Sequence, residues 1–185
     1  VGVYRSWSDE LVGLNVDNYT SDWSLTENTW QDLRRGQSYI SLKVFDGVGN
    51  FVNIPDAFYV KKDTEPPATT NNITGRLTTW FNADPGNIID IDFSDTELSK
   101  LSTAYYYVNT LPERSGTVIA TGTVFGYISD RISYDTNWGL NSGHWQLLQT
   151  GTNYITVSVY DVAGNSSTIV DAFKVLKDTV APSAI

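Results

Sequence analysis

The sequence predicts an all-β protein with one complete β-sandwich module and, before it, the later part of a second module. Residues 23–67 align with residues 138–182 without a gap, at an offset of 115, and about 21 of these 45 positions are identical. Self-similarity at a fixed period indicates repeated structural units, and this period suits one β-sandwich module. Apolar residues alternate as in strands, and no stretch has the period of a long helix.

The self-match also sets the predicted domain boundaries. A first repeat covers residues 1–67 and lacks a counterpart of residues 68–115, so we expect it to be the C-terminal part of an incomplete module. The complete repeat covers residues 68–182. Residues 183–185 then form a linker or begin a further repeat.

The clearest predicted strands belong to two long hairpins that the self-match repeats. Residues 154–160 place Ile155, Val157 and Val159 on one face, and residues 39–45 repeat the alternation. Each strand is followed by Asp-x-x-Gly-Asn, a turn sequence, so a partner strand is expected after each turn. These partner strands are predicted at residues 51–61 and 166–176. Further strands are predicted at residues 88–94 and 104–108, and residues 117–125 and 127–134 are expected to supply one or two more.

Short helical turns and a tyrosine motif are expected between the strands. Residues 142–148 and 27–33 each predict one helical turn, with Trp145 facing inward. The spacing Leu-x-x-Gly-x-x-Tyr, which ends at Tyr154 and again at Tyr39, fits a tyrosine corner, in which the phenol bonds back to upstream backbone. We therefore expect both tyrosines to be structural.

The composition argues against several classes of function. The chain has no Cys and a single His, His144, which removes thiolate metal sites, Cys nucleophiles and most His-dependent catalysis. Its net charge of −9 and pI near 4.4 argue against nucleic acid as a partner. No run approaches 18 apolar residues, so no membrane-spanning segment is predicted. Thr29 replaces His144 in the other copy, so His144 is expected at the surface.

Four segments of the sequence resemble bacterial immunoglobulin-like modules. GTNYITVSVYDVAGN at residues 151–165 is similar to their last-but-one strand, and FKVLKDTVAP at residues 173–182 is similar to their last strand and linker. Residues 88–95 and 104–108 resemble the second and third strands. The resemblance is to tandem repeats, also called fibronectin III-like, of large surface or adhesin-type proteins. It implies tandem Ig-like β-sandwich modules, the first one incomplete.

The tryptophans divide into a repeated group and an unmatched one. Trp23, Trp30, Trp138 and Trp145 recur beside Leu at matched spacing, which favours core anchors over sugar-stacking platforms. Trp80 falls in the segment that the first repeat lacks. It either packs at the end of the module or binds a glycan, and it is the candidate ligand-binding residue.

Calcium is the one cofactor that the resemblance suggests. Similar modules in adhesins bind Ca²⁺ at linkers, which makes Asp63 and Asp178 the first candidates, followed by Asp46 and Asp161. The alternative is that Asp in Asp-x-x-Gly-Asn only caps its own turn. No contiguous EF-hand-like loop is present.

The catalytic patterns point away from an enzyme. Asp90 and Asp92 share one face of a predicted strand, where two carboxylates are expected to be solvated rather than catalytic. The chain has no Gly-x-Ser-x-Gly motif, no P-loop and no dinucleotide fingerprint.

The predicted function is structural. The chain is expected to be an extracellular or cell-surface module of a tandem-repeat protein: a stalk, an adhesin shaft or a cell-envelope layer. Its expected partners are neighbouring Ig-like repeats of the same or adjacent chains, with cell-surface polysaccharide as a further candidate. The alternatives are a carbohydrate-binding accessory module that uses Trp80, and an accessory domain of a secreted polysaccharide-degrading enzyme.

The missing front of the first repeat needs its own explanation. A sandwich without its first strands would expose core and open edges. Either the chain is a piece of a longer polypeptide, which the sequence favours, or another chain supplies the missing strands.

Overall fold

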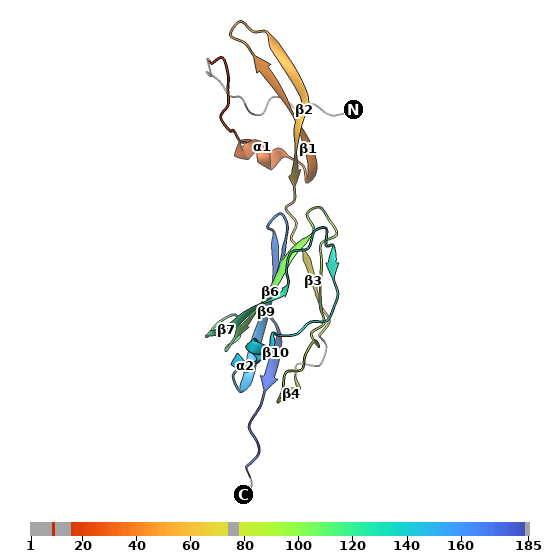
Figure 1. Ribbon diagram of the computed structural model, residues 1–185, viewed down its shortest axis with the longest axis vertical. Coiled ribbons are helices and arrows are strands. Elements are labelled where there is room, and N and C mark those ends of the chain that lie inside the picture. Colours follow the sequence, from red (N-terminus) through yellow and green to blue (C-terminus); the bar gives the residue numbers. More distant parts are fainter. Residues whose placement is uncertain (1–8, 10–15, 74–77, 184–185) are drawn as a thin grey trace. The chain divides into compact units, whose positions relative to one another are not determined.

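The computed structural model describes residue 9 and residues 16–73 and 78–183, and strands make up most of its regular structure (Figure 1). The prediction of an all-β protein is therefore confirmed. The chain divides into two compact units, Val1–Asp63 and Thr64–Ile185, which are called the first and second unit below. This division falls four residues before the predicted boundary, which lies after residue 67.

The described part of the first unit is one helix and one hairpin. Helix α1 (Glu27–Asp32) is followed by β1 (Gly36–Phe45) and β2 (Phe51–Lys62), which pair in antiparallel fashion. The turn between the strands is the predicted Asp-x-x-Gly-Asn sequence, with Gly49 at a positive φ of 95°. Glycine adopts this conformation without the steric cost that a Cβ would add.

The second unit contains two sheets and one short helix. A three-stranded sheet has the order β3-β5-β8, and a five-stranded sheet has the order β4-β10-β9-β6-β7. The strands are β3 (Ala68–Asn71), β4 (Trp80–Phe81), β5 (Ile91–Ser94), β6 (Leu101–Asn109), β7 (Val118–Phe125), β8 (Ser133–Tyr134), β9 (Gly151–Asp161) and β10 (Ser166–Lys177). Helix α2 (Ser142–Leu147) lies between β8 and β9 in the sequence.

Side chains from both sheets form a single core in the second unit. Phe93 of β5 comes from the three-stranded sheet, whereas Tyr106, Val157 and Phe173 come from β6, β9 and β10 of the five-stranded sheet. Each of these side chains is at most 3% exposed. Alternate strand residues point to opposite faces, so the predicted alternation of Ile155, Val157 and Val159 is what buries this face.

Both helices begin at a side-chain cap, as short helices need. The side chain of Thr26 accepts a hydrogen bond from Thr29 N at 3.3 Å, and that of Asn141 accepts one from Gly143 N at 2.9 Å. Such caps satisfy backbone N–H groups that have no partner within the helix. The two short helical turns that the sequence predicted are confirmed.

A buried lysine closes the other end of α2. Lys177, at the end of β10, donates from Nζ to the carbonyl oxygens of Trp145, Gln146 and Leu148 at 3.1, 3.4 and 3.0 Å. These carbonyls belong to the last turn, where no N–H within the helix reaches them. The ammonium group has three donors, which match the three acceptors.

The first unit repeats this contact at positions 115 residues earlier. Lys62 donates from Nζ to the carbonyl oxygens of Trp30, Gln31 and Leu33 at 2.8, 3.2 and 3.2 Å. In both units the ammonium lies 5.4 Å from the centre of the tryptophan ring. The self-match repeats both lysines, but their role could not be predicted from the sequence.

Each long hairpin also contains a bulge that the sequence did not predict. Between paired positions, β9 contributes one residue, Thr156, where β10 contributes residues 170–172. Asp171 has a φ of 50°, and its N–H donates to Thr156 Oγ1 at 3.2 Å. In the first unit Asp56 has a φ of 49° and donates to Ser41 Oγ at 3.0 Å. The serine or threonine hydroxyl thus satisfies a donor that the bulge takes out of the ladder.

Two predicted strands are shorter than the sequence suggested. Residues 88–94 pair as a strand only over β5, and within residues 127–134 only β8 is a strand. Asp130 has a φ of 61°, a left-handed conformation that interrupts an extended chain. Neither β3 nor β4 was predicted, because both are short and lack an alternating pattern.

Lys177→Met is expected to destabilise the second unit by about 2–4 kcal/mol, because it leaves three helix carbonyls without their charged donor. The apolar stem is kept, so the loss reports the hydrogen bonds. Guanidinium unfolding followed by tryptophan fluorescence measures it. Lys174→Met, an exposed lysine on the same strand, is the control and should change stability by less than about 0.5 kcal/mol. Equal effects of the two variants would contradict the proposed role of Lys177.

Candidate functional site

Trp80 lies on an edge strand of the five-stranded sheet. Strand β4 pairs in parallel with the end of β10, with Trp80 opposite Leu176 and Phe81 opposite Lys177. Because neighbouring strand residues point to opposite faces, Phe81 packs against the core while Trp80 is 57% exposed. The exposed ring of Trp80 is therefore held in place by its neighbour Phe81, which packs against the core.

The cavity near Trp80 is too small for an organic ligand. It has a volume of about 40 Å³ and lies among Phe81, Pro85, Trp145 and Phe173. This volume has room for only a few water molecules. A ligand of Trp80 would thus lie on the surface, against the exposed ring.

A row of tyrosines covers the outer face of the same sheet. Tyr105 and Tyr107 of β6, and Tyr154 and Tyr160 of β9, alternate with core residues and are half-buried. The rings of Tyr105 and Tyr160 meet edge to face at 6.1 Å. The sequence analysis did not predict this surface, although the three consecutive tyrosines of residues 105–107, in a predicted strand, require two of them to face outward.

The pKa of Tyr107 is raised, chiefly because burial disfavours the charged phenolate and secondarily because of Tyr160. Its hydroxyl therefore stays protonated at neutral pH and can donate a hydrogen bond. The Arg114 guanidinium lies 4.7 Å from the Tyr107 ring. Aromatic rings with hydroxyl groups at their tips suit contacts with sugars or with polar backbone.

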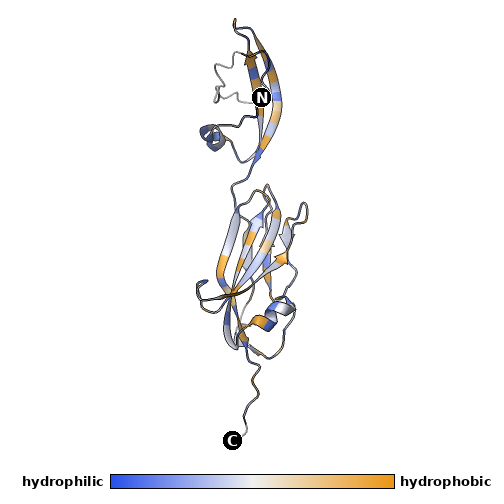
Figure 2. Cartoon of the chain, turned by 60° about the vertical axis from the view of Figure 1, so that its left-hand side comes forward, coloured by the Kyte–Doolittle hydropathy of each residue, from blue (hydrophilic) through white to orange (hydrophobic). Residues whose placement is uncertain are grey.

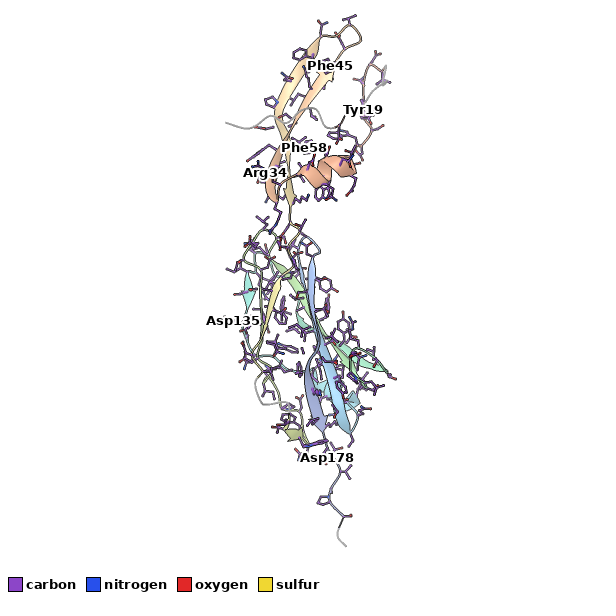
Figure 3. The ribbon with its side chains drawn as sticks, turned by 180° about the vertical axis from the view of Figure 1, so that it is seen from behind. Tyr19, Arg34, Phe45, Phe58, Asp135 and Asp178 are labelled. Carbon is purple, nitrogen blue, oxygen red and sulfur yellow. The ribbon has the colours of Figure 1, made fainter. Side chains whose placement is uncertain are left out.

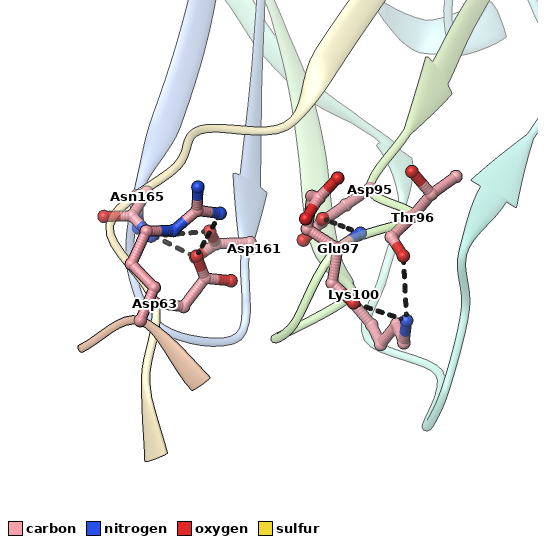
Figure 4. Close-up of polar contacts among 8 residues, drawn as sticks. Asp63, Asp95, Thr96, Glu97, Lys100, Asp161 and Asn165 are labelled. Carbon is pink, nitrogen blue, oxygen red and sulfur yellow. Dashed lines mark hydrogen bonds and ion pairs between the residues drawn. The ribbon is translucent and has the colours of Figure 1, made fainter. Parts of the chain in front are cut away.

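Asp46 and Asp161, the acids in the two Asp-x-x-Gly-Asn turns, accept hydrogen bonds from residues of their own turns. Asp46 Oδ1 accepts from Val48 N at 3.0 Å and from Asn50 N at 2.8 Å, and Oδ2 accepts from Asn50 Nδ2 at 2.8 Å. Asp161 accepts in the same way from Asn165 N and Nδ2, both at 2.8 Å (Figure 4). This geometry is that of a turn cap, the alternative to calcium binding.

The two linker acids have local partners as well. Within the first unit, Asp63 Oδ1 lies 3.7 Å from Arg35 Nη2. Asp178 is exposed, and its Oδ1 accepts from Val180 N at 2.9 Å (Figure 3). Neither arrangement gathers the six to eight oxygen ligands that Ca²⁺ takes.

One pair of buried acids in the second unit has the spacing of potential cation ligands. A carboxylate oxygen of Asp95 lies within 4.8 Å of one of Asp161. Asp95 Oδ1 also accepts from Glu97 N at 3.2 Å (Figure 4). The two acids are 66 positions apart in the sequence, which gives no sign of this proximity. Calcium binding by Asp46, Asp63, Asp161 or Asp178 stays a prediction.

The predicted tyrosine corner is wrong in its choice of residue. Tyr39 is 62% exposed, and among the described residues neither its hydroxyl nor that of Tyr154 forms a hydrogen bond. Asn153, fully buried, makes the corner instead. Its Nδ2 donates to Gln149 O at 2.9 Å and its Oδ1 accepts from Gln149 N at 3.1 Å. The tyrosine points outward because Ile155, next to it on β9, points into the core.

The four repeated tryptophans differ between the units in exposure. Trp138 and Trp145 are each 4% exposed and belong to the core, as predicted. Trp23 is 39% exposed and Trp30 is half-buried. The contact with phenylalanine is nevertheless the same: Trp138 meets Phe173 edge to face at 6.0 Å, and 115 residues earlier Trp23 meets its phenylalanine at 5.8 Å.

His144 was predicted at the surface, but it is half-buried and bonded. Its Nδ1 lies 2.8 Å from the hydroxyl of Tyr106, which also accepts from Asn141 N at 2.9 Å. Burial is the main cause that raises the pKa of Tyr106, and the bond from Asn141 opposes it. The hydroxyl joins β6 to the start of α2, a structural role for the pair.

In the first unit an aspartate, Asp9, accepts hydrogen bonds from the two positions that correspond to Asn141 and His144. Asp9 accepts from Thr26 N at 2.9 Å through Oδ2 and from Thr29 Oγ1 at 2.8 Å through Oδ1. Thr26 and Thr29 correspond, at the offset of 115, to Asn141 and His144. The carboxylate thus takes the place that a tyrosine hydroxyl has in the second unit.

Comparison with known proteins leaves the family open. No protein-family model matches the chain, and the search of curated proteins found no match. Neither of the two described helices is long and apolar enough to cross a membrane.

The turn cap at Asp46 predicts a lowered pKa that depends on Asn50. The side-chain bond from Asn50 is the largest cause, and it outweighs the opposing desolvation. Because the folded pKa lies below the unfolded one, the cap stabilises the hairpin above the unfolded pKa and is lost as pH falls through the folded pKa. An NMR titration should give a midpoint below 3.8, and Asn50→Ala should raise it. An unchanged midpoint in the variant would contradict the cap.

Proposed function

We propose that the chain is a structural part of a secreted or cell-surface tandem-repeat protein, built from Ig-like β-sandwich modules. The observation that carries the proposal is the agreement between positions 115 residues apart. Lys62 and Lys177 close matching helices, and Asp46 and Asp161 cap matching turns. Agreement in side-chain contacts as well as in sequence is expected of repeated modules.

In this role each module would act through its own stability. The second unit holds its own core, closed by the lysine at the end of β10, so it would bear load without a partner. A net charge of −9 on 185 residues would keep a long array soluble and oppose lateral association. Pro66 and Pro67, just after the first repeat's Asp-Thr sequence, would restrict the backbone of the linker.

The parent polypeptide is expected to be many times larger than 20.5 kDa, because a stalk or envelope layer needs many modules. An antibody against the chain, used on a denatured extract of its source, measures this mass. Protease treatment of intact cells should remove the signal if the protein is at the surface. A polypeptide near 20.5 kDa would overturn the proposal.

A second candidate function is carbohydrate binding, and the exposure of Trp80 favours it. The ring lies on an edge strand anchored by Phe81, so it would meet a sugar face without reordering. Stacking of an aromatic ring on an apolar sugar face needs no deep pocket, in agreement with the small cavity nearby.

Trp80→Ala should weaken any polysaccharide binding about tenfold or more, because it removes the stacking surface. Affinity electrophoresis in gels that contain soluble β-glucan, xylan or mannan measures the retardation. Tyr127→Ala, which removes a 61% exposed aromatic ring from a loop, is the matched control. Equal mobility of the wild type with and without every polysaccharide would exclude this function for the glycans tested.

A further inference from the structure

One face of the first-unit hairpin, called the inner face below, carries Val44 and Phe58. It has the apolar residues of a core but is exposed. Val44 is 53% exposed, whereas Val159, 115 residues later, is 0% exposed. Phe58 is 38% exposed, and its counterpart Phe173 is 3% exposed. Figure 2 shows the apolar bands along this hairpin, and Figure 3 labels Phe58 on it. The same residue types are buried in one unit and open in the other.

In the part of the chain that the structure describes, one edge of β1 has no partner strand. In the second unit β9 pairs with β10 on one side and with β6 on the other. Strand β1 is the counterpart of β9, and within the described residues it pairs only with β2. A strand with one unpaired edge presents backbone N–H and C=O groups that can accept another strand.

The second unit shows which strand fits such an edge. Strand β6 is antiparallel to β9, with Tyr106 opposite Val157 and Val108 opposite Ile155. At the offset of 115 these β9 positions are Leu42 and Ile40 of β1. A strand like β6, with apolar residues at alternate positions, would therefore continue the ladder of β1 in a defined register.

The charges on the two strands are compatible with this pairing. Strand β6 carries no charged residue over Leu101–Asn109. The single charge on β1 is Lys43, on the outer face, at the position that corresponds to Ser158. Tyr105 is the β6 residue opposite Ser158, so the ammonium would meet a tyrosine ring, a favourable cation–π neighbour.

We propose that the inner face of the first unit and the edge of β1 form a strand-acceptor site, whose occupant is the front half of a repeat unit, with strands like β5, β6 and β7. This rests on the proposed repeat architecture and adds the register and chemistry of the joint. The β5-like strand would cover the exposed apolar face, as Phe93 covers it in the second unit.

The pKa of Asp9 should report whether the strand-acceptor site is filled. Its carboxylate holds Thr26 N and Thr29 Oγ1, the positions whose counterparts in the second unit are bound by the Tyr106 hydroxyl. A strand like β6 would bring a tyrosine hydroxyl to the same place. Filling the site should therefore displace the Asp9 carboxylate and return its lowered pKa toward the ordinary value.

The test completes the first unit by fusion. Residues 68–115 are joined directly before Val1 of the full chain, because extending the offset of 115 from the self-match places residue 1 at residue 116. Hydrogen exchange of β1, read by mass spectrometry, should slow at least tenfold relative to the unfused chain. The tryptophan emission should shift to shorter wavelength as Trp23 becomes buried, and the NMR midpoint of Asp9 should rise.

Two substitutions in the fusion separate pairing from nonspecific collapse. Leu42→Lys places a charge on the inner face and should abolish the protection of β1. Tyr39→Lys, on the outer face of the same strand, should leave it intact, because alternate residues face opposite sides. Unchanged exchange of β9 in each protein shows that the second unit is folded.

Two results would overturn the strand-acceptor site. The first is an absence of added protection in β1 while β9 stays protected. The second is an unfused chain that is dimeric by light scattering at about 10 µM with β1 already protected, since a second copy would then cover the face. Neither result bears on the mass of the parent polypeptide, which tests the repeat architecture separately.

Discussion

The contact between a buried lysine and the last carbonyls of a short helix organises both units. A six-residue helix has almost no stability of its own, because most of its backbone groups lie in its first and last turns. Lys177 ends β10 and holds the final turn of α2, so the strand and the helix fix each other. The ammonium can be buried because carbonyl oxygens surround it. The apolar part of the same side chain lies by Trp145, which α2 directs into the core.

The sequence predicted those features that depend on residues close to each other in the chain. The two long hairpins, their Asp-x-x-Gly-Asn turns and the two helical turns follow from alternation and turn chemistry. The self-match showed each of these features twice in the sequence. Burial of Trp138 and Trp145 could also be predicted, because a large apolar side chain at matched positions favours a core.

The remaining features depend on contacts between distant segments. Lys177 meets carbonyls about 30 residues away, and a lysine in a strand gives no sign of such a role. Asn153 rather than Tyr154 forms the hydrogen bonds of the corner. Ile155 points into the core, so its neighbour Tyr154 points outward. His144 was expected at the surface because Thr29 replaces it, yet both positions form hydrogen bonds, with Tyr106 in one unit and with Asp9 in the other. The tyrosine surface also depends on distant segments, since the pairing of β6 with β9 brings Tyr105 beside Tyr160.

The bulge in each long hairpin constrains how such a chain can change its length. Two extra residues on β10 keep the side-chain alternation in phase, so Ile169 before the bulge and Phe173 after it face the same side. A single inserted or deleted residue would reverse the phase and turn one half of the strand inside out. Insertions and deletions at this point should therefore be tolerated in pairs, and the left-handed residue at its centre should remain Asp, Asn or Gly.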